Sequence, residues 1–155
     1  MTDGDEKRTG LDFAVLELSA PISSIKTVSL SRNYEPLQKV YAFGYPAIVI
    51  EDDPDLIPAL LGDRKALPAI VSTTGEIKSI KKNDRNVEVI ASGARISGGN
   101  SGGPLFNDCG HVIGINTCSK AKKRKSVDFA LSGKEIINFL SRRSVAFSEV
   151  TGACR

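Results

Sequence analysis

The sequence of 155 residues contains one histidine, three cysteines and no tryptophan. No apolar run approaches the roughly 18 residues that a membrane-spanning helix needs, so we expect no membrane partner. No apolar leader follows the charged residues 2–10, and the compartment stays open: an upstream signal would make the protein secreted or periplasmic. The 21 basic and 18 acidic residues nearly balance, which gives no reason to expect a nucleic-acid partner.

The cysteines are too few and too far apart for a metal site, because no C-x-x-C motif occurs. The sequence therefore implies no metal and no cofactor. An odd number of cysteines allows at most one internal disulfide. The pairing of Cys109, Cys118 and Cys154 stays open, and Cys118 is either a small packing residue or a partner for Cys154.

What the sequence does contain is a series of short apolar runs separated by turn residues. Strands are expected at 12–18, 28–30, 38–43, 70–80 with a break at Gly75, 86–91, 104–106, 112–117 and 127–131. A short helix is expected at 55–61. Ser132, followed three residues later by Glu135, predicts the start of a terminal helix. This order predicts an all-β fold, an antiparallel β-barrel with a C-terminal α-helix.

Two polar segments allow more than one interpretation. Residues 47–69 hold three prolines and an acidic cluster, and an ordinary insertion is favoured there over a regulatory loop. The basic run Lys120–Lys125 lies between two expected strands. A solvated loop is favoured for it over a nucleic-acid signal, because short charge runs are usually exposed.

The segment Gly99-Asn-Ser-Gly-Gly-Pro-Leu105 carries the chemistry. A serine nucleophile needs a tight loop whose backbone N–H groups converge on one oxygen, and glycine permits that approach. The N–H groups of Gly99 and Ser101 would then form an oxyanion hole beside the Ser101 hydroxyl.

Residues 94–107 and 110–117 resemble the nucleophile region of the trypsin/chymotrypsin-like serine proteases, and most closely their bacterial Deg/HtrA-type branch. The segment Asp12-Phe-Ala-Val-Leu-Glu-Leu18 resembles the strand that carries the catalytic aspartate of that family. Asp12 precedes Ser101, which matches the family's order of histidine, aspartate and serine along the chain. The resemblance implies a serine endopeptidase that acts on a peptide or protein substrate, with Ser101 and Asp12 as catalytic residues.

The same resemblance implies a division of the chain and a substrate site. Residues 1–35 would be a remnant of the first barrel, 36–143 the second barrel with the terminal helix, and 144–155 a tail. Thr117, Cys118 and Ser119 would form the edge strand that pairs with substrate, and the Thr117 hydroxyl would reach Asp12. Arg95 falls near the floor of the specificity pocket, where it would favour acidic side chains.

The chain departs from the family in its histidine. The family's histidine lies upstream of the aspartate, whereas His111 lies downstream in the expected 104–117 hairpin. Its position near Phe106 is five residues from Ser101, or about 16 Å at ~3.3 Å per residue, too far for a general base. Asn100 also departs from trypsin, which has an aspartate before the serine and pairs it with a freed N-terminus.

Two interpretations explain the absent histidine. In the favoured one the sequence lacks an N-terminal half-barrel that would supply it. In the other the chain is a non-catalytic pseudoprotease that binds peptides. Either way we expect an uncovered apolar pair on the 12–18 segment, either Phe13 with Val15 or Leu16 with Leu18.

Overall fold

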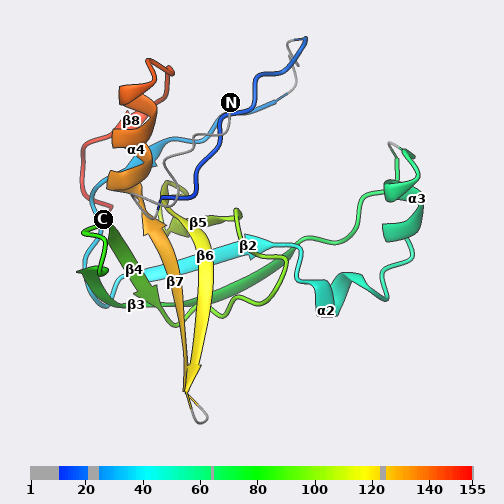
Figure 1. The fold of residues 1–155 in the computed structure, drawn as a ribbon, viewed down its shortest axis with the longest axis horizontal. Helices are drawn as coiled ribbons and strands as arrows, with labels where there is room; N and C mark the ends of the chain where they lie inside the picture. The colour runs from blue at the N-terminus through cyan, green and yellow to red at the C-terminus, as the bar shows by residue number, and fades with distance from the viewer. Residues whose placement is uncertain (1–10, 21–24, 64, 123–124, 155) are drawn as a thin grey trace.

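The computed structural model describes residues 11–20, 25–63, 65–122 and 125–154 (Figure 1). Its elements in chain order are β1 (Leu30–Ser31), β2 (Lys39–Gly44), α2 (Ala47–Ile50), α3 (Leu56–Leu60), β3 (Val71–Lys82), β4 (Glu88–Ser92), β5 (Pro104–Asn107), β6 (Val112–Lys122), β7 (Lys125–Ser132), α4 (Gly133–Arg142) and β8 (Glu149–Val150). No helix in these ranges is long and apolar enough to cross a membrane.

A closed antiparallel barrel forms the body of the molecule. The strand order is β5-β2-β3-β4-β7-β6, and pairing of β5 with β6 closes the ring. Alternate residues point inward along each strand, as the period of a β-strand requires. The core consists of Val40, Ala42, Ile77, Ile90, Ala94, Leu105, Ile113 and Ala130. The predicted all-β barrel with a C-terminal helix is confirmed.

The segment 11–20 is not the strand that its apolar pattern predicts. Its side chains alternate in burial from Leu11 to Leu16, but no strand in the described ranges pairs with it. A strand needs a hydrogen-bonded neighbour, so the pattern alone does not produce one. Phe13 instead packs against Phe139 of α4, with ring centroids 5.2 Å apart. Leu16 and Leu18 are 87% and 58% exposed, which confirms the expected uncovered pair.

Two interruptions predicted from sequence, the break at Gly75 and the loop at Lys120–Lys125, are wholly or partly strand. β3 runs without a break through Gly75, because the glycine lets the Gly93–Ala94 backbone lie directly against it. Its irregularity falls later, between Ile77 and Ser79. The basic run also differs from the predicted loop: Lys120–Lys122 belong to β6 and Lys125 to β7, and residues 123–124 lie outside the described ranges.

The terminal helix α4 begins where the sequence predicts. The Ser132 side chain accepts a hydrogen bond from the Glu135 N–H at 3.4 Å, and Ser132 is fully buried. The Glu135 carboxylate accepts the Glu88 N–H of β4 at 3.0 Å, so the helix start is tied to the barrel. Ile136, Ile137 and Phe139 are buried on the face toward the barrel.

The insertion between β2 and β3 projects from the barrel and carries α2 and α3 (Figure 1). Several of its apolar side chains are exposed, among them Ile48, Leu60 and Leu61. The Asp53 carboxylate accepts the Ala69 N–H at 2.8 Å and the Asp55 N–H at 2.9 Å. These two bonds lower the pKa of Asp53 and fasten the ends of the outer part of the insertion.

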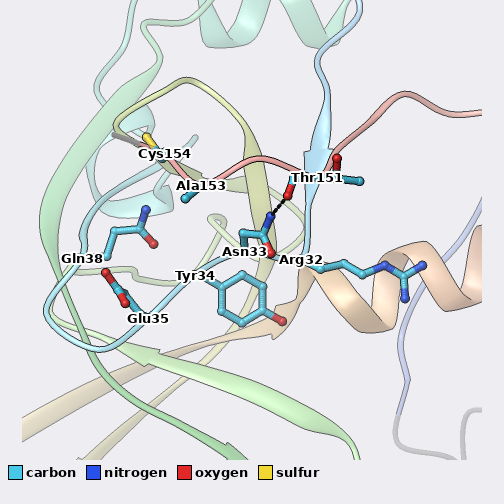
Figure 2. A pocket seen from close by; sticks show the side chains of 8 residues that line it. All are labelled: Arg32, Asn33, Tyr34, Glu35, Gln38, Thr151, Ala153 and Cys154. Atoms are coloured by element: carbon cyan, nitrogen blue, oxygen red, sulfur yellow. Dashed lines mark hydrogen bonds between the residues drawn. The ribbon is translucent and has the colours of Figure 1, made fainter.

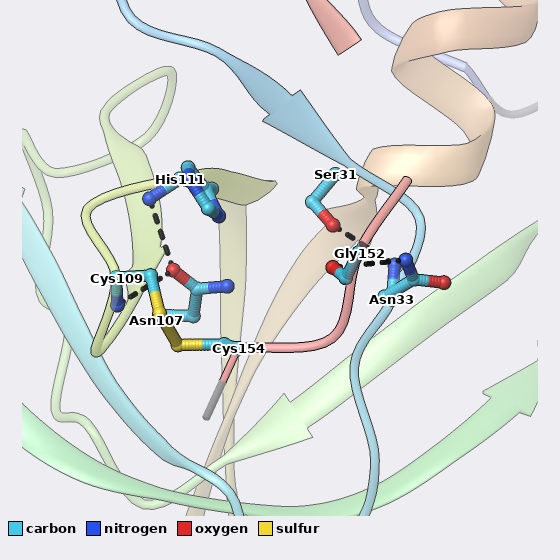
Figure 3. Close-up of a disulfide and its surroundings, with 7 residues drawn as sticks. All are labelled: Ser31, Asn33, Asn107, Cys109, His111, Gly152 and Cys154. Atoms are coloured by element: carbon cyan, nitrogen blue, oxygen red, sulfur yellow. Dashed lines mark hydrogen bonds between the residues drawn. A yellow bond between two sulfur atoms is a disulfide. The ribbon is translucent and has the colours of Figure 1, made fainter. Parts of the chain in front are cut away.

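The C-terminal segment returns to the barrel instead of trailing free. β8 pairs in parallel with β1, and β1 pairs in parallel with β6. The Asn33 side chain donates to the Thr151 carbonyl at 2.6 Å (Figure 2). A disulfide joins Cys109 in the β5–β6 turn to Cys154 (Figure 3). The open question of pairing is thereby answered, and the Cys118–Cys154 alternative is wrong.

A half-buried phenol, that of Tyr34, links the same region to the barrel wall. The Tyr34 hydroxyl donates to the Glu88 carboxylate at 2.6 Å. Burial first, and this hydrogen bond second, raise the pKa of Tyr34 well above its usual value. Tyr34 therefore remains a neutral donor throughout the ordinary pH range.

We expect replacement of both bridge cysteines, Cys109→Ser with Cys154→Ser, to lower the free energy of unfolding by about 2–4 kcal/mol. The bridge spans a sequence separation of 45 residues, so its loss gives the unfolded chain more freedom. Urea unfolding followed by circular dichroism measures the difference. Cys118→Ser, outside this bridge, should leave it intact. Equal stability of the double variant and the bridged protein would contradict the expectation.

Candidate active site

The loop that carries Ser101 joins β4 to β5 and begins with a tight turn. The Asn100 N–H donates to the Ser97 carbonyl at 3.0 Å, with Gly98 and Gly99 between them. Gly99 has φ +97°, whereas Gly98 is not in the positive-φ region. This combination defines a type II turn, whose third residue is favoured to be glycine.

Two glycines let the loop lie at backbone distance from the chain that follows β2. A Cβ on Gly99 would overlap the Tyr45 carbonyl oxygen, and one on Gly103 would overlap the Phe43 carbonyl oxygen. No rearrangement of a flexible side chain would relieve either overlap, because both obstacles are backbone. The glycines of the motif are therefore required by packing as well as by the turn.

Asn116 of β6 holds the loop from the other side, and sequence reasoning missed it. Its N–H donates to Gly103 O at 2.8 Å, and its carbonyl accepts the Gly102 N–H at 2.9 Å. Its side-chain amide donates to Phe43 O and Pro104 O, both at 3.4 Å. Asn116 is 3% exposed. A polar residue directly after the apolar run Val112–Ile115, on the same expected strand, was the available signal.

Ser101 is exposed at the tip of this loop, and its hydroxyl donates to the Thr117 carbonyl at 2.8 Å. A carbonyl does not remove a proton, so this bond orients the hydroxyl without activating it. The main-chain N–H groups of Gly99 and Ser101 have no hydrogen-bond acceptor within the described ranges. Both expected oxyanion donors are therefore available to a ligand oxygen.

A cavity of about 530 Å³ has Ser101 and Asp12 in its lining. The rest of its lining comes from Phe13 and Ala14 beside Asp12, from Gly102 beside Ser101, and from β6, β7 and α4, whose apolar members are Ile115, Leu131, Ile136, Phe139 and Leu140. Thr117 also lines the cavity, but no hydrogen bond joins its hydroxyl to the Asp12 carboxylate. The structure thus brings the two sequence-predicted catalytic residues to one cavity.

His111 lies away from this cavity. Its N–H donates to the Asn107 side chain at 2.9 Å, within the β5–β6 turn beside the disulfide (Figure 3). The Asn107 N–H donates in return to the His111 carbonyl at 3.0 Å. The histidine therefore stands where the predicted hairpin puts it, and it is not among the residues that line the cavity.

The segment Thr117–Ser119 has a paired side and an open side. Cys118 pairs with Phe129 and Ser119 with Asp128 of β7. On the other side the pairing of β6 with β5 extends only to Ile115. Within the described ranges no strand continues it, so this stretch of β6 is available for an added strand.

Arg95 lies outside the cavity. It is exposed and precedes the nucleophile turn, and its carbonyl accepts the Thr73 hydroxyl at 2.6 Å. It is not among the lining residues around Ser101. No group of three or more histidine, cysteine, aspartate or glutamate side chains in the described ranges is arranged to hold a metal.

A closed six-stranded antiparallel barrel followed by a C-terminal helix is the fold of a trypsin-like peptidase domain. A family model described as "Trypsin-like peptidase domain" matches residues 4–115. The chain belongs to this family.

Its similarity is to the HtrA-type members. It is 32% identical over 143 residues to serine protease HTRA1B of Danio rerio, covering 90% of this chain and 26% of that protein. It is 32% identical over 115 residues to the putative serine protease HhoB of Synechocystis, covering 73% of this chain and 24% of that protein. The chain therefore spans about a quarter of the length of these relatives.

Among solved structures, the HtrA-type protease AlgW with a decapeptide aligns with a TM-score of 0.58 at 23% identity. The alignment covers 78% of this chain and 34% of that one. At that identity the likeness establishes the fold alone.

We expect Gly103→Ala to lower the free energy of unfolding by about 1–3 kcal/mol, because the added methyl group meets the Phe43 carbonyl. Gly98→Ala is the matched control in the same loop. Its methyl group would have no neighbour within 4 Å, and we expect a change within about 0.5 kcal/mol. Thermal and urea unfolding measure both variants. Similar losses in the two would contradict the packing argument.

Proposed function

We propose that this chain is the nucleophile-bearing part of a serine endopeptidase. The observation that carries the proposal is the pairing of an exposed Ser101 with two unbonded amides on a rigid turn. In the reaction, the Ser101 oxygen attacks the substrate carbonyl carbon while its proton passes to an imidazole. The carbonyl π-electrons move to the oxygen, which the Gly99 and Ser101 N–H groups stabilise.

The intermediate collapses by returning these electrons and breaking the C–N bond, and the imidazolium gives its proton to the leaving amine. Water then hydrolyses the acyl-serine with the imidazole again as base. We propose that this imidazole belongs to a histidine encoded upstream of Met1, in an N-terminal half-barrel. The cavity between Asp12 and Ser101 would receive it, with Asp12 orienting its ring.

The substrate would be an extended peptide that adds to the open side of Thr117–Ser119. The aligned structures of the HtrA-type protease AlgW contain a tripeptide or a decapeptide, which supports a peptide as the ligand class. Arg95 would favour an acidic side chain if the bound peptide reached it, since an arginine pairs with a carboxylate. The second candidate function, peptide binding without hydrolysis, is favoured by the open edge together with the single, distant His111.

Labelling of the 155-residue chain in the presence of free imidazole tests the enzyme proposal directly. Imidazole is small enough to enter the cavity and act as the general base there. We expect imidazole to accelerate labelling of Ser101 by a fluorophosphonate by about 10²-fold, the size of a general-base contribution. Mass spectrometry of the digested protein identifies the labelled residue. Ser101→Ala should abolish the label.

Asp12→Asn should reduce the imidazole-dependent rate, whereas Asp108→Asn, an exposed aspartate not in the cavity lining, should not. The chain extended by its upstream coding sequence should label without added imidazole. Absence of Ser101 labelling under both conditions would reject the enzyme proposal. Peptide-induced NMR shifts confined to Thr117–Ser119 would then support the binding module.

A further inference from the structure

The side chain of Asp128 is buried in the barrel without a partner. Asp128 is 3% exposed, and its Oδ1 atom has no hydrogen-bond donor in the described ranges. No described lysine, arginine or histidine forms an ion pair with it. A carboxylate taken out of water needs a donor or a cation, because its lost hydration is otherwise not replaced. Neither the barrel core nor the proposed hydrolysis uses this group.

The strand register shows which way Asp128 faces. On β7 it lies two residues before Ala130, and its neighbour on β4 is Ser92, two residues after Ile90. Ala130 and Ile90 belong to the barrel core, and the β4–β7 pairing is regular from there to Asp128. Side chains alternate along a strand, so the Asp128 carboxylate points into the barrel as these core residues do. Ser92 is buried as well, so two polar residues form the layer next to the apolar core.

This polar layer lies at the end of the barrel that carries Ser101. β4 ends at Ser92, and the loop to Ser101 begins directly after it. On its other side Asp128 pairs with Ser119 of β6, and the Thr117 carbonyl of that strand accepts the Ser101 hydroxyl at 2.8 Å. Ser119 is two residues beyond Thr117, or about 7 Å along a strand, and paired strands lie about 5 Å apart. Asp128 is therefore next to the open stretch of β6, within reach of a long side chain of a peptide bound there.

We propose that Asp128 determines the substrate specificity of this chain, and that it selects a lysine or arginine side chain on the residue whose carbonyl Ser101 attacks. The inference rests on the proposed function, because it assumes a peptide on the open side of Thr117–Ser119. A cationic side chain of that peptide gives Oδ1 the charged donor that no described residue provides. A neutral or acidic side chain leaves the carboxylate unpartnered, which weakens the complex.

Asp128 and Arg95 make opposite predictions about the substrate. Arg95 would favour an acidic side chain, but it is exposed, and salt screens the interactions of exposed charges. Asp128 is buried, and a buried charge pair is screened much less. We therefore expect the buried carboxylate to dominate, and a basic residue to be preferred directly before the bond that is cut.

Peptide binding to the unmodified chain tests this selection without any reaction. An acetylated tetrapeptide amide whose last residue is lysine is compared with the same peptide ending in norleucine, which lacks the charge, or in glutamate. We expect the lysine peptide to bind about 10-fold or more tighter than the norleucine peptide, as for a hydrogen bond to a charged group, and the glutamate peptide to bind most weakly. NMR titration measures the dissociation constants. The ¹³Cγ resonance of Asp128 should shift with the lysine peptide and not with the norleucine peptide.

Asp128→Asn keeps the shape of the side chain and removes its charge. We expect this variant to lose most of the preference for lysine over norleucine, while the norleucine peptide still binds. Asp84→Asn is the matched control, because Asp84 is exposed in the turn between β3 and β4, and it should keep the preference. If Asp128→Asn does not fold, the ¹³Cγ resonance of the unmodified chain still decides.

Equal binding of the three peptides, no binding of any, or an Asp128 resonance that does not respond to the lysine peptide would overturn the proposal. Labelling of Ser101 with imidazole reports the proposed hydrolysis separately. If Ser101 is never labelled while lysine selection depends on Asp128, hydrolysis fails and the selection stands for a binding module. If Ser101 is labelled while the peptides bind equally, hydrolysis stands and the selection by Asp128 fails.

Discussion

Close backbone contact between two segments underlies the rest of this structure. The chain that leaves β2 and the loop that carries Ser101 touch along their main chains, and only glycine at 99 and 103 permits it. This contact orders the turn, places the serine at the mouth of a cavity and leaves two amides unbonded. Asn116 supports the same loop from β6 with two backbone hydrogen bonds, and its side-chain amide donates to β2 and β5 on either side, so the loop is held from both sides.

The Ser101 hydroxyl is oriented by a backbone carbonyl. It donates to the Thr117 carbonyl, which lies at the start of the open stretch of β6. An imidazole in the cavity would draw the hydroxyl away and free that carbonyl to accept from a bound peptide. The Thr117 carbonyl oxygen would thus accept first from the resting Ser101 hydroxyl and then from a bound peptide. This one oxygen atom links the two candidate functions.

Sequence reasoning succeeds here where local chemistry decides the structure. Alternating apolar residues predict the barrel strands, Ser132 with Glu135 predicts the helix start, and the glycine motif predicts the nucleophile loop. It fails where a partner distant in sequence decides. Residues 12–18 have a strand pattern, but no strand in the part of the chain that the structure describes pairs with them. The pairing of Cys154 with Cys109 depends on where the β5–β6 turn lies.

The site contains residues that no motif could reveal. Ala47 contacts the nucleophile loop through its main-chain N–H, which donates to the Gly98 carbonyl and which every residue except proline has, so its identity carries no signal. Asn116 acts largely through its backbone as well, although a buried amide in an apolar strand was a partial clue. The meeting of Asp12 and Ser101 at one cavity was implied by resemblance and lies beyond what spacing alone predicts.

The disulfide has a topological consequence for the molecule. It closes a covalent ring that contains β6, β7, α4 and β8, while Asp12 and Ser101 lie on the chain before the ring. A peptidase that cut once anywhere between Cys109 and Cys154 would open the ring without separating it into two pieces. Such a nicked molecule would keep its mass on a non-reducing gel, and its cut would become visible only after reduction.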